Sequence, residues 1–192
     1  MLEFCSAEPV ERVFLDEAAR RGFGRMLATV ENGHVSALCH FGANVVPSGQ
    51  GSGAFAKETA GSRARMIIGD ERAVTELWEA ARERVPPPRE DRPGQPVFAI
   101  TEAPEPGGSG LREAAPADLE LLLPACAATH EGEIGVDPLR LDAEGFRRRT
   151  RQQIDDRRSW VWIEGGTILF KAEASAWTPH AVQLQQVWVD PE

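Results

Sequence analysis

The chain has 192 residues, and 42% of them are hydrophobic, which is enough to bury a core in one large or two small domains. A formal net charge of −9 argues against nucleic acid as a partner, because phosphates are bound by basic surfaces. The sequence has no apolar run of about 18 residues, and its N-terminus is acidic where a secretory signal is basic. We therefore expect a cytoplasmic protein without a membrane span.

The first half predicts a smaller α/β domain over residues 1–102. The runs RMLATV and VSALCHFGANVV flank Asn32 and Gly33, which both tolerate positive φ, and this arrangement predicts a β-hairpin. The glycine-rich SGQGSG, which has the spacing of a phosphate loop but no flanking basic residue, is expected to be a flexible loop.

Further elements complete this half. GAFAKETA predicts a short helix, and ARMIIG and QPVFAIT predict strands. Asp70 is expected to cap a helix between those two strands. The buried face of that helix is expected to comprise Val74, Leu77, Trp78 and Ala81.

The stretch APEPGGSG, residues 103–110, is too rich in proline and glycine for a helix or a central strand and is expected to be a domain linker. Residues 111–192 then predict a short strand, a helix from about Ala117 and a second helix capped by Asp142. Three consecutive strands follow as WVWIEGG, TILFKAEASAWTP and AVQLQQVWVDPE. The predicted fold class is a mixed, mostly antiparallel sheet flanked by helices, an α/β (α+β) arrangement.

The stretch ILFKAEASAWTPHAVQLQQVWVDPE resembles the third and fourth strands of a GNAT-type N-acetyltransferase, in a bacterial subfamily that has an N-terminal domain of unknown function. The first half shares weaker similarity, such as FGANVVP and RPGQPVFAI. In that family a glycine-rich turn with arginines comes next and binds the acetyl-CoA pyrophosphate. This chain ends before such a turn, so we expect a truncated chain that is inactive by itself.

The last strand carries the expected cofactor contact. Its apolar parity slips from even positions, Val182 and Leu184, to odd ones, which predicts a bulge near Gln185 and Gln186. The resemblance implies that such a bulge frees backbone groups to pair with the pantetheine arm of acetyl-CoA. We assign this contact to the backbone of Val187, Trp188 and Val189, the alternative being an ordinary amphipathic strand.

Glu173 is the candidate catalytic base, because a carboxylate among apolar residues of a strand is costly unless it is solvated or used. The alternative is a lateral ion pair with Lys171 on the open side of the sheet. His34, His130 and His180 are interpreted as solvated turn or helix-end residues. A solvated helix face is also expected for the arginine cluster, which comprises Arg147, Arg148, Arg149, Arg151, Arg157 and Arg158.

The three cysteines are widely spaced and include no CxxC pair, so we expect reduced thiols and no metal site at Cys5, Cys39 and Cys126. The resemblance to GNAT enzymes implies an N-acetyltransferase that moves an acetyl group from acetyl-CoA to a small-molecule or peptide amine. The sequence does not determine the oligomeric state, and a homo-oligomer is one possibility. One alternative is a non-catalytic GNAT-like module that binds a regulator or partner, and a more distant one is an unrelated α/β ligand-binding protein.

Overall fold

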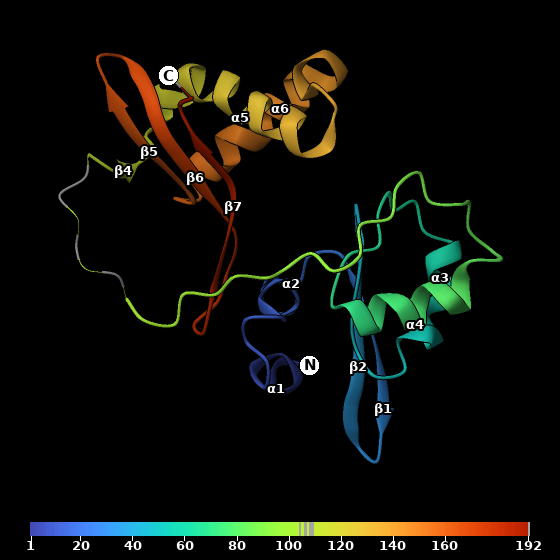
Figure 1. The fold of residues 1–192 in the computed structure, drawn as a ribbon. Helices are drawn as coiled ribbons and strands as arrows, with labels where there is room; N and C mark the ends of the chain where they lie inside the picture. The colour runs from blue at the N-terminus through green and yellow to red at the C-terminus, as the bar shows by residue number, and fades with distance from the viewer. Residues whose placement is uncertain (104, 106, 108–109, 192) are drawn as a thin grey trace. The chain divides into compact units, whose positions relative to one another are not determined.

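The computed structural model describes residues 1–103, 105, 107 and 110–191, and these form two compact units (Figure 1). The first unit comprises residues 1–101 with 177–181, and the second comprises the described residues of 102–176 and 182–192. The predicted linker includes positions 104, 106, 108 and 109, which lie outside the described residues. The division into domains 1–102 and 111–192 stays a prediction.

The first unit contains a three-stranded antiparallel sheet in the order β1-β2-β3. β1 spans Arg25–Glu31, β2 spans His34–Phe41 and β3 spans Val45–Gly49. The β1–β2 turn has Asn32 at φ 52° and Gly33 at φ 83°, which confirms the predicted hairpin. The expected second strand is divided into β2 and β3, so the unit holds a meander instead of one hairpin.

Helices cover both faces of this sheet. Ala37, Cys39 and Phe41 of β2 pack in one core. This core includes residues of η1 (Ser52–Phe55), α3 (Ala56–Ala60) and α4 (Glu71–Ala81). The intervening Leu38 of β2 packs in a second core with residues of α1 (Leu2–Ser6) and α2 (Val13–Arg21). This alternation follows from the two-residue repeat of a strand. α1 and α2 were not predicted from the sequence.

α4 confirms the predicted helix and its cap. The Asp70 side chain accepts a hydrogen bond of 2.8 Å from the Ala73 backbone N–H. The fully buried face consists of Ala73, Leu77 and Ala81. Val74 and Trp78, which we expected on that face, are only half-buried, because each lies at its edge, one position beyond a fully buried residue.

Two predicted strands do not form. In residues 64–69 only Ile67 makes a bridge, parallel to Val45. Residues 95–101 have no strand structure, and Val97, Phe98 and Ile100 are largely exposed. A strand requires a neighbour for its backbone hydrogen bonds, and composition alone does not supply one.

The SGQGSG loop is anchored by an acidic side chain. Glu76 of α4 accepts hydrogen bonds from the backbone N–H groups of Gly51 and Ser52, at 2.8 and 3.1 Å. The Gly51 N–H is the main cause that lowers the pKa of Glu76, with Arg72 and Ser52 adding to it. A carboxylate therefore occupies the N–H groups that a phosphate would use.

His40 is buried in the first unit without a hydrogen bond. It lies in β2, only 5% exposed, with the rings of Phe14 and Phe23 packed edge-on against it. Neither ring nitrogen has a hydrogen-bond partner among the described residues. Burial lowers the pKa of His40, and the nearby Phe23 backbone opposes this shift.

We therefore expect His40 to make the first unit sensitive to acid. With a lowered folded-state pKa, the unfolded chain takes up the proton first, so stability falls as pH drops below about 6.5. His40→Phe should remove this loss, because an unsatisfied buried polar group is replaced by an apolar ring. Denaturant unfolding of the native protein and of His40→Phe at pH 7.5 and 5.5 measures this loss of stability. His34→Phe is the control, because His34 is exposed. Equal acid sensitivity of the native chain and His40→Phe would refute the prediction.

The second unit contains a four-stranded sheet in the order β4-β5-β6-β7 (Figure 1). Its strands are β4 (Arg112–Glu113), β5 (Ser159–Glu164), β6 (Thr167–Trp177) and β7 (Val182–Val189). β5 and β6 are antiparallel and meet at the Gly165-Gly166 turn, where both glycines have positive φ. The mixed α+β fold with antiparallel sheets and flanking helices is as predicted.

Two helices, α5 (Leu119–Ile134) and α6 (Pro138–Asp155), follow the short η2 (Pro116–Asp118) and build the core of this unit. The core includes the predicted α5 face of Leu119, Leu122, Leu123 and Cys126. α6 begins earlier than expected, because Asp137 caps its first turn. Asp142 breaks the helical geometry inside α6, and its carboxylate accepts from the Gly145 N–H at 2.9 Å, capping the turn that follows.

Candidate functional site: a buried lysine–glutamate pair

The second unit buries an ion pair that involves Glu173, the predicted base. The Lys171 Nζ lies 3.6 Å from Glu173 Oε1, and the two side chains are 0% and 8% exposed. The Cys126 thiol of α5 donates a hydrogen bond of 3.3 Å to the same Glu173 oxygen. Three polar groups from one helix and one strand therefore meet below the surface.

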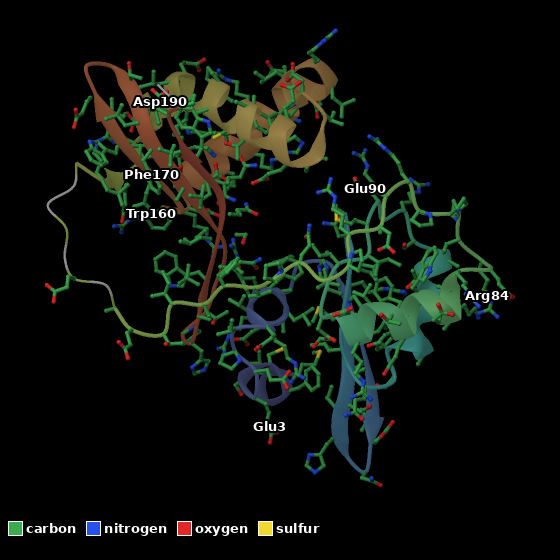
Figure 2. All side chains as sticks on the ribbon, viewed as in Figure 1. Glu3, Arg84, Glu90, Trp160, Phe170 and Asp190 are labelled. Atoms are coloured by element: carbon green, nitrogen blue, oxygen red, sulfur yellow. The ribbon has the colours of Figure 1, made fainter. Side chains whose placement is uncertain are left out.

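An irregularity in β6 determines which way these side chains point. Trp162 pairs with Phe170 and Ile163 pairs with Ile168, so Leu169 is an extra residue in β6. This insertion changes the parity of the strand. Lys171 lies opposite the core residue Val161 and therefore points toward the helices. Trp160 and Phe170 alternate with these residues and belong to the other face (Figure 2).

The expectation of an ion pair on the open side of the sheet is therefore wrong. The pair exists, but it is buried beside α5. Lysine is almost never fully buried unless it is paired, and removing an ion from water costs several kcal/mol. Such expensive arrangements are frequent at functional sites, which makes this cluster the main candidate site.

A glutamine connects the buried pair to the surface. Lys171 Nζ donates a hydrogen bond of 3.2 Å to Gln186 Oε1 of β7. Gln186 Nε2 in turn donates one of 3.4 Å to Glu133 Oε2, on the exposed last turn of α5. The polar groups thus form a continuous path from Glu133 at the surface through Gln186 and Lys171 to Glu173.

The backbone of Gln186 is also unusual, with φ of 52° in the middle of β7. A left-handed residue inside a strand is the mark of a bulge, and it lies where the parity slip predicted one. The proposed cofactor residues follow directly. Trp188 packs against the core of the unit, whereas Val187 and Val189 are 50% and 64% exposed. Their role and that of Glu173 stay predictions.

Cys126 is held as an unreactive thiol. Burial raises its pKa to about 12, with Lys171 opposing the shift and Glu173 adding to it. Cys5 and Cys39 are also free and buried. A thiol with this pKa is mostly protonated at neutral pH and cannot act as a nucleophile.

We expect Cys126 to resist alkylation in the native protein. At pH 8 its thiolate fraction is on the order of 10⁻⁴, and the side chain is covered. Iodoacetamide followed by peptide mass spectrometry should label it no faster than Cys39, and both should react promptly in guanidinium chloride. Labelling of native Cys126 at the rate of an exposed thiol would show that the cluster is open to solvent.

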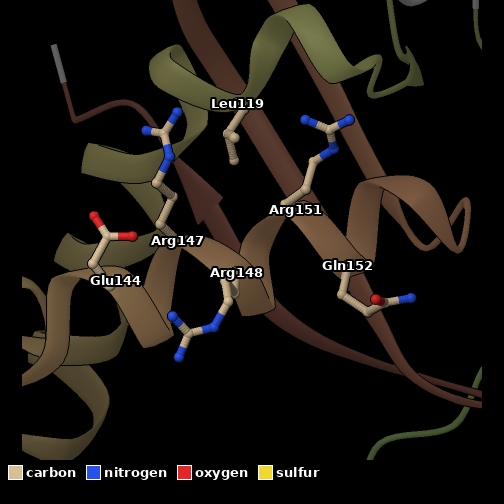
Figure 3. Close-up of a pocket in the computed structure, with 6 residues that line it drawn as sticks. All are labelled: Leu119, Glu144, Arg147, Arg148, Arg151 and Gln152. Carbon is tan, nitrogen blue, oxygen red and sulfur yellow. The ribbon is translucent and has the colours of Figure 1, made fainter.

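Three arginines of the cluster, Arg147, Arg148 and Arg151, line a shallow groove of about 370 Å³ on α6 (Figure 3). Figure 3 shows the guanidinium groups of Arg147 and Arg151 on either side of Leu119, whereas Arg148 points away from them. Arg147 pairs with Glu120, and Arg151 pairs with Asp155 at 3.0 Å. These exposed ion pairs support a solvated helix face for Arg147 and Arg151. Arg157 and Arg158, which we expected on the same helix, lie beyond the end of α6.

The remaining candidates give no second site. His34 and His180 are exposed, as expected. His130 is inside α5 and packs edge-on against Phe146; burial and the Arg149 charge lower its pKa. Among the described residues no group of three or more His, Cys, Asp or Glu is placed to hold a metal ion. In the same part of the chain, none of the helices has the length and apolar character needed to cross a membrane.

The chain thus contains one unit built on a helix-covered β-meander and a second unit whose sheet carries the candidate site. Residues 24–122 match a family model described as "Domain of unknown function (DUF4081)", and the chain belongs to that family. The match covers β1 to the start of α5, so Cys126, Lys171, Glu173 and Gln186 lie outside it.

Other comparisons are distant. No curated protein matches the chain. A solved structure titled "Acetyltransferase from GNAT family from Colwellia psychrerythraea" is 11% identical, with a TM-score of 0.42, over 98% of this chain and 75% of that chain. A similarity this low does not put individual residues of the two chains in correspondence.

Three site residues were missed from the sequence. Cys126 was placed on a buried helix face but without a polar partner, and Glu133 carried no signal. Gln186 was recognised only as the position of a bulge. The parity slip in β7 was therefore the one available signal for the link between Gln186 and Lys171.

Proposed function

We propose that this protein is an N-acetyltransferase that uses acetyl-CoA, with Glu173 as the base and the backbone of residues 187–189 as the cofactor contact. The proposal rests on the backbone conformation and the side-chain contact of Gln186. Its left-handed backbone interrupts β7 immediately before these residues, and its side chain reaches the Lys171–Glu173 pair. The resemblance of β6 and β7 to GNAT strands supports the same assignment.

The amine nitrogen attacks the thioester carbon of acetyl-CoA, so that the C–N bond forms, the C–S bond breaks, and CoA leaves as a thiolate that takes up a proton from solvent. The amine must lose a proton as its nitrogen forms the new bond, and a carboxylate can accept that proton directly or through one water. The Lys171 Nζ, 3.6 Å from Glu173 Oε1, is the ionic partner of this carboxylate. The exposed Glu133 adds a second negative charge at the surface end of the path, which favours an ammonium-bearing acceptor.

The proposal is tested with the purified protein by following release of the CoA thiol. Acetyl-CoA is offered with small primary amines and with lysine-containing peptides, and mass spectrometry identifies the product. We expect CoA release that depends on the amine, with an acetyl group on nitrogen. Absence of both acetyl-CoA binding and amine-dependent release at millimolar concentrations would refute the proposal.

A second function is favoured for the first unit by the Glu76 contact. Because a carboxylate fills the N–H groups of Gly51 and Ser52, this unit does not offer that loop to a phosphate. We propose that the unit is a non-catalytic module that binds a partner or regulator. Deleting residues 1–101 should then leave the chemistry of acetyl transfer intact in the second unit, provided that the remaining chain folds alone, which circular dichroism and unfolding measurements establish first.

A further inference from the structure

We infer that Gln186 is a positioning residue that fixes the cofactor strand and the catalytic base in one arrangement. This inference rests on the proposed acetyl transfer. It assigns two separable roles to one residue: the backbone shapes β7, and the side-chain amide positions Lys171 and, through it, Glu173.

The backbone role follows from the left-handed φ of Gln186. Among the described residues, Asn32, Arg157 and Gln186 are the non-glycine residues with positive φ. Asn32 lies in a hairpin turn and Arg157 follows the end of α6, where such geometry is common. Gln186 alone of the three lies inside a strand, and this conformation is strained for a residue with a Cβ.

The side-chain role follows from the two ends of the amide. Its oxygen accepts from the Lys171 ammonium and its nitrogen donates to the Glu133 carboxylate. An amide offers an acceptor to a cation and a donor to an anion on one side chain. A glutamate at this position would face Glu133 with like charge, and a lysine would do the same to Lys171.

The two roles are joined at Lys171. Its ammonium contacts Gln186 on one side and Glu173 on the other, and the side chain is fully buried. Packed interiors transmit small displacements because they contain few voids. A shift of Gln186 therefore moves the charge that Glu173 faces, so the cofactor strand and the base change together.

Gln186→Gly and Gln186→Val separate the two roles. Glycine keeps the left-handed backbone and loses the amide, whereas valine loses the amide and disfavours that backbone. Gln183→Val is the matched control, because Gln183 is exposed on the same strand and outside the bulge. Acetyl-CoA affinity is measured by calorimetry, and kcat and KM by CoA release, after unfolding curves establish that each variant is folded.

We expect Gln186→Gly to bind acetyl-CoA within about threefold of the native protein while kcat falls about tenfold or more. Gln186→Val should lose at least about tenfold in both quantities, and Gln183→Val should match the native protein. Equal affinities of the Gly and Val variants, or an unchanged kcat in Gln186→Gly, would overturn the inference while leaving acetyl transfer established. A native protein without acetyl-CoA binding or transfer would overturn the proposed function, and this inference with it.

Discussion

Replacing Lys171 with methionine should lower the free energy of unfolding by about 3–5 kcal/mol, because it leaves Glu173 as a buried charge without its partner. Methionine is similar in length and apolar, so little packing is lost. The Cys126 thiol still donates to Glu173, but one neutral donor does not replace an ammonium. Denaturant unfolding at pH 7.5 measures the change.

The control for this prediction is the double substitution Lys171→Met with Glu173→Met. Removing both charges avoids the unpaired group, so the double variant should recover much of the lost stability. Unfolding of the two single variants and the double variant completes a thermodynamic cycle. A Lys171→Met protein within about 1 kcal/mol of the native one would mean that the pair is solvated and contributes little.

Glu173→Gln should lower the turnover of acetyl transfer by about 10²–10⁴-fold, the usual contribution of a general base. The amide keeps the shape of the carboxylate but cannot accept the proton from the amine. Acetyl-CoA affinity should change only a few-fold, because the proposed cofactor contacts are backbone groups of β7. CoA release measures the turnover, and calorimetry measures the acetyl-CoA affinity.

Glu131→Gln is the matched control, since Glu131 is an exposed carboxylate on α5, the helix that also contributes Cys126. Unfolding curves must show that Glu173→Gln is folded, because Lys171 loses its ionic partner. If a folded Glu173→Gln protein kept the native turnover across pH, Glu173 would not be the base and would serve only in a structural ion pair.

The parts of the fold that sequence predicts best depend on local chemistry. Asn32 and Gly33 require a turn because both tolerate positive φ, and Asp70 begins α4 because its side chain satisfies the Ala73 N–H. The bulge at Gln186 was also accessible, since side-chain parity changes when one residue is inserted in a strand. Each of these signals lies within a few residues of its effect.

The parts that sequence does not predict depend on tertiary neighbours. The extra residue Leu169 turns Lys171 toward α5, and no local pattern separates that orientation from the open side of the sheet. QPVFAIT has the composition of a strand but forms none among the described residues. His40 is buried because Phe14 and Phe23, distant in sequence, pack against it.

The most direct test of the central claim is backbone amide hydrogen exchange of the protein with and without acetyl-CoA. If β7 after Gln186 contacts the cofactor, the amides of Val187, Trp188 and Val189 should exchange more slowly in its presence. The exchange rates of the loop at residues 48–53, whose N–H groups at Gly51 and Ser52 bind Glu76, should be unchanged. Protection of that loop, with no effect on residues 187–189, would contradict the account and place the cofactor in the first unit.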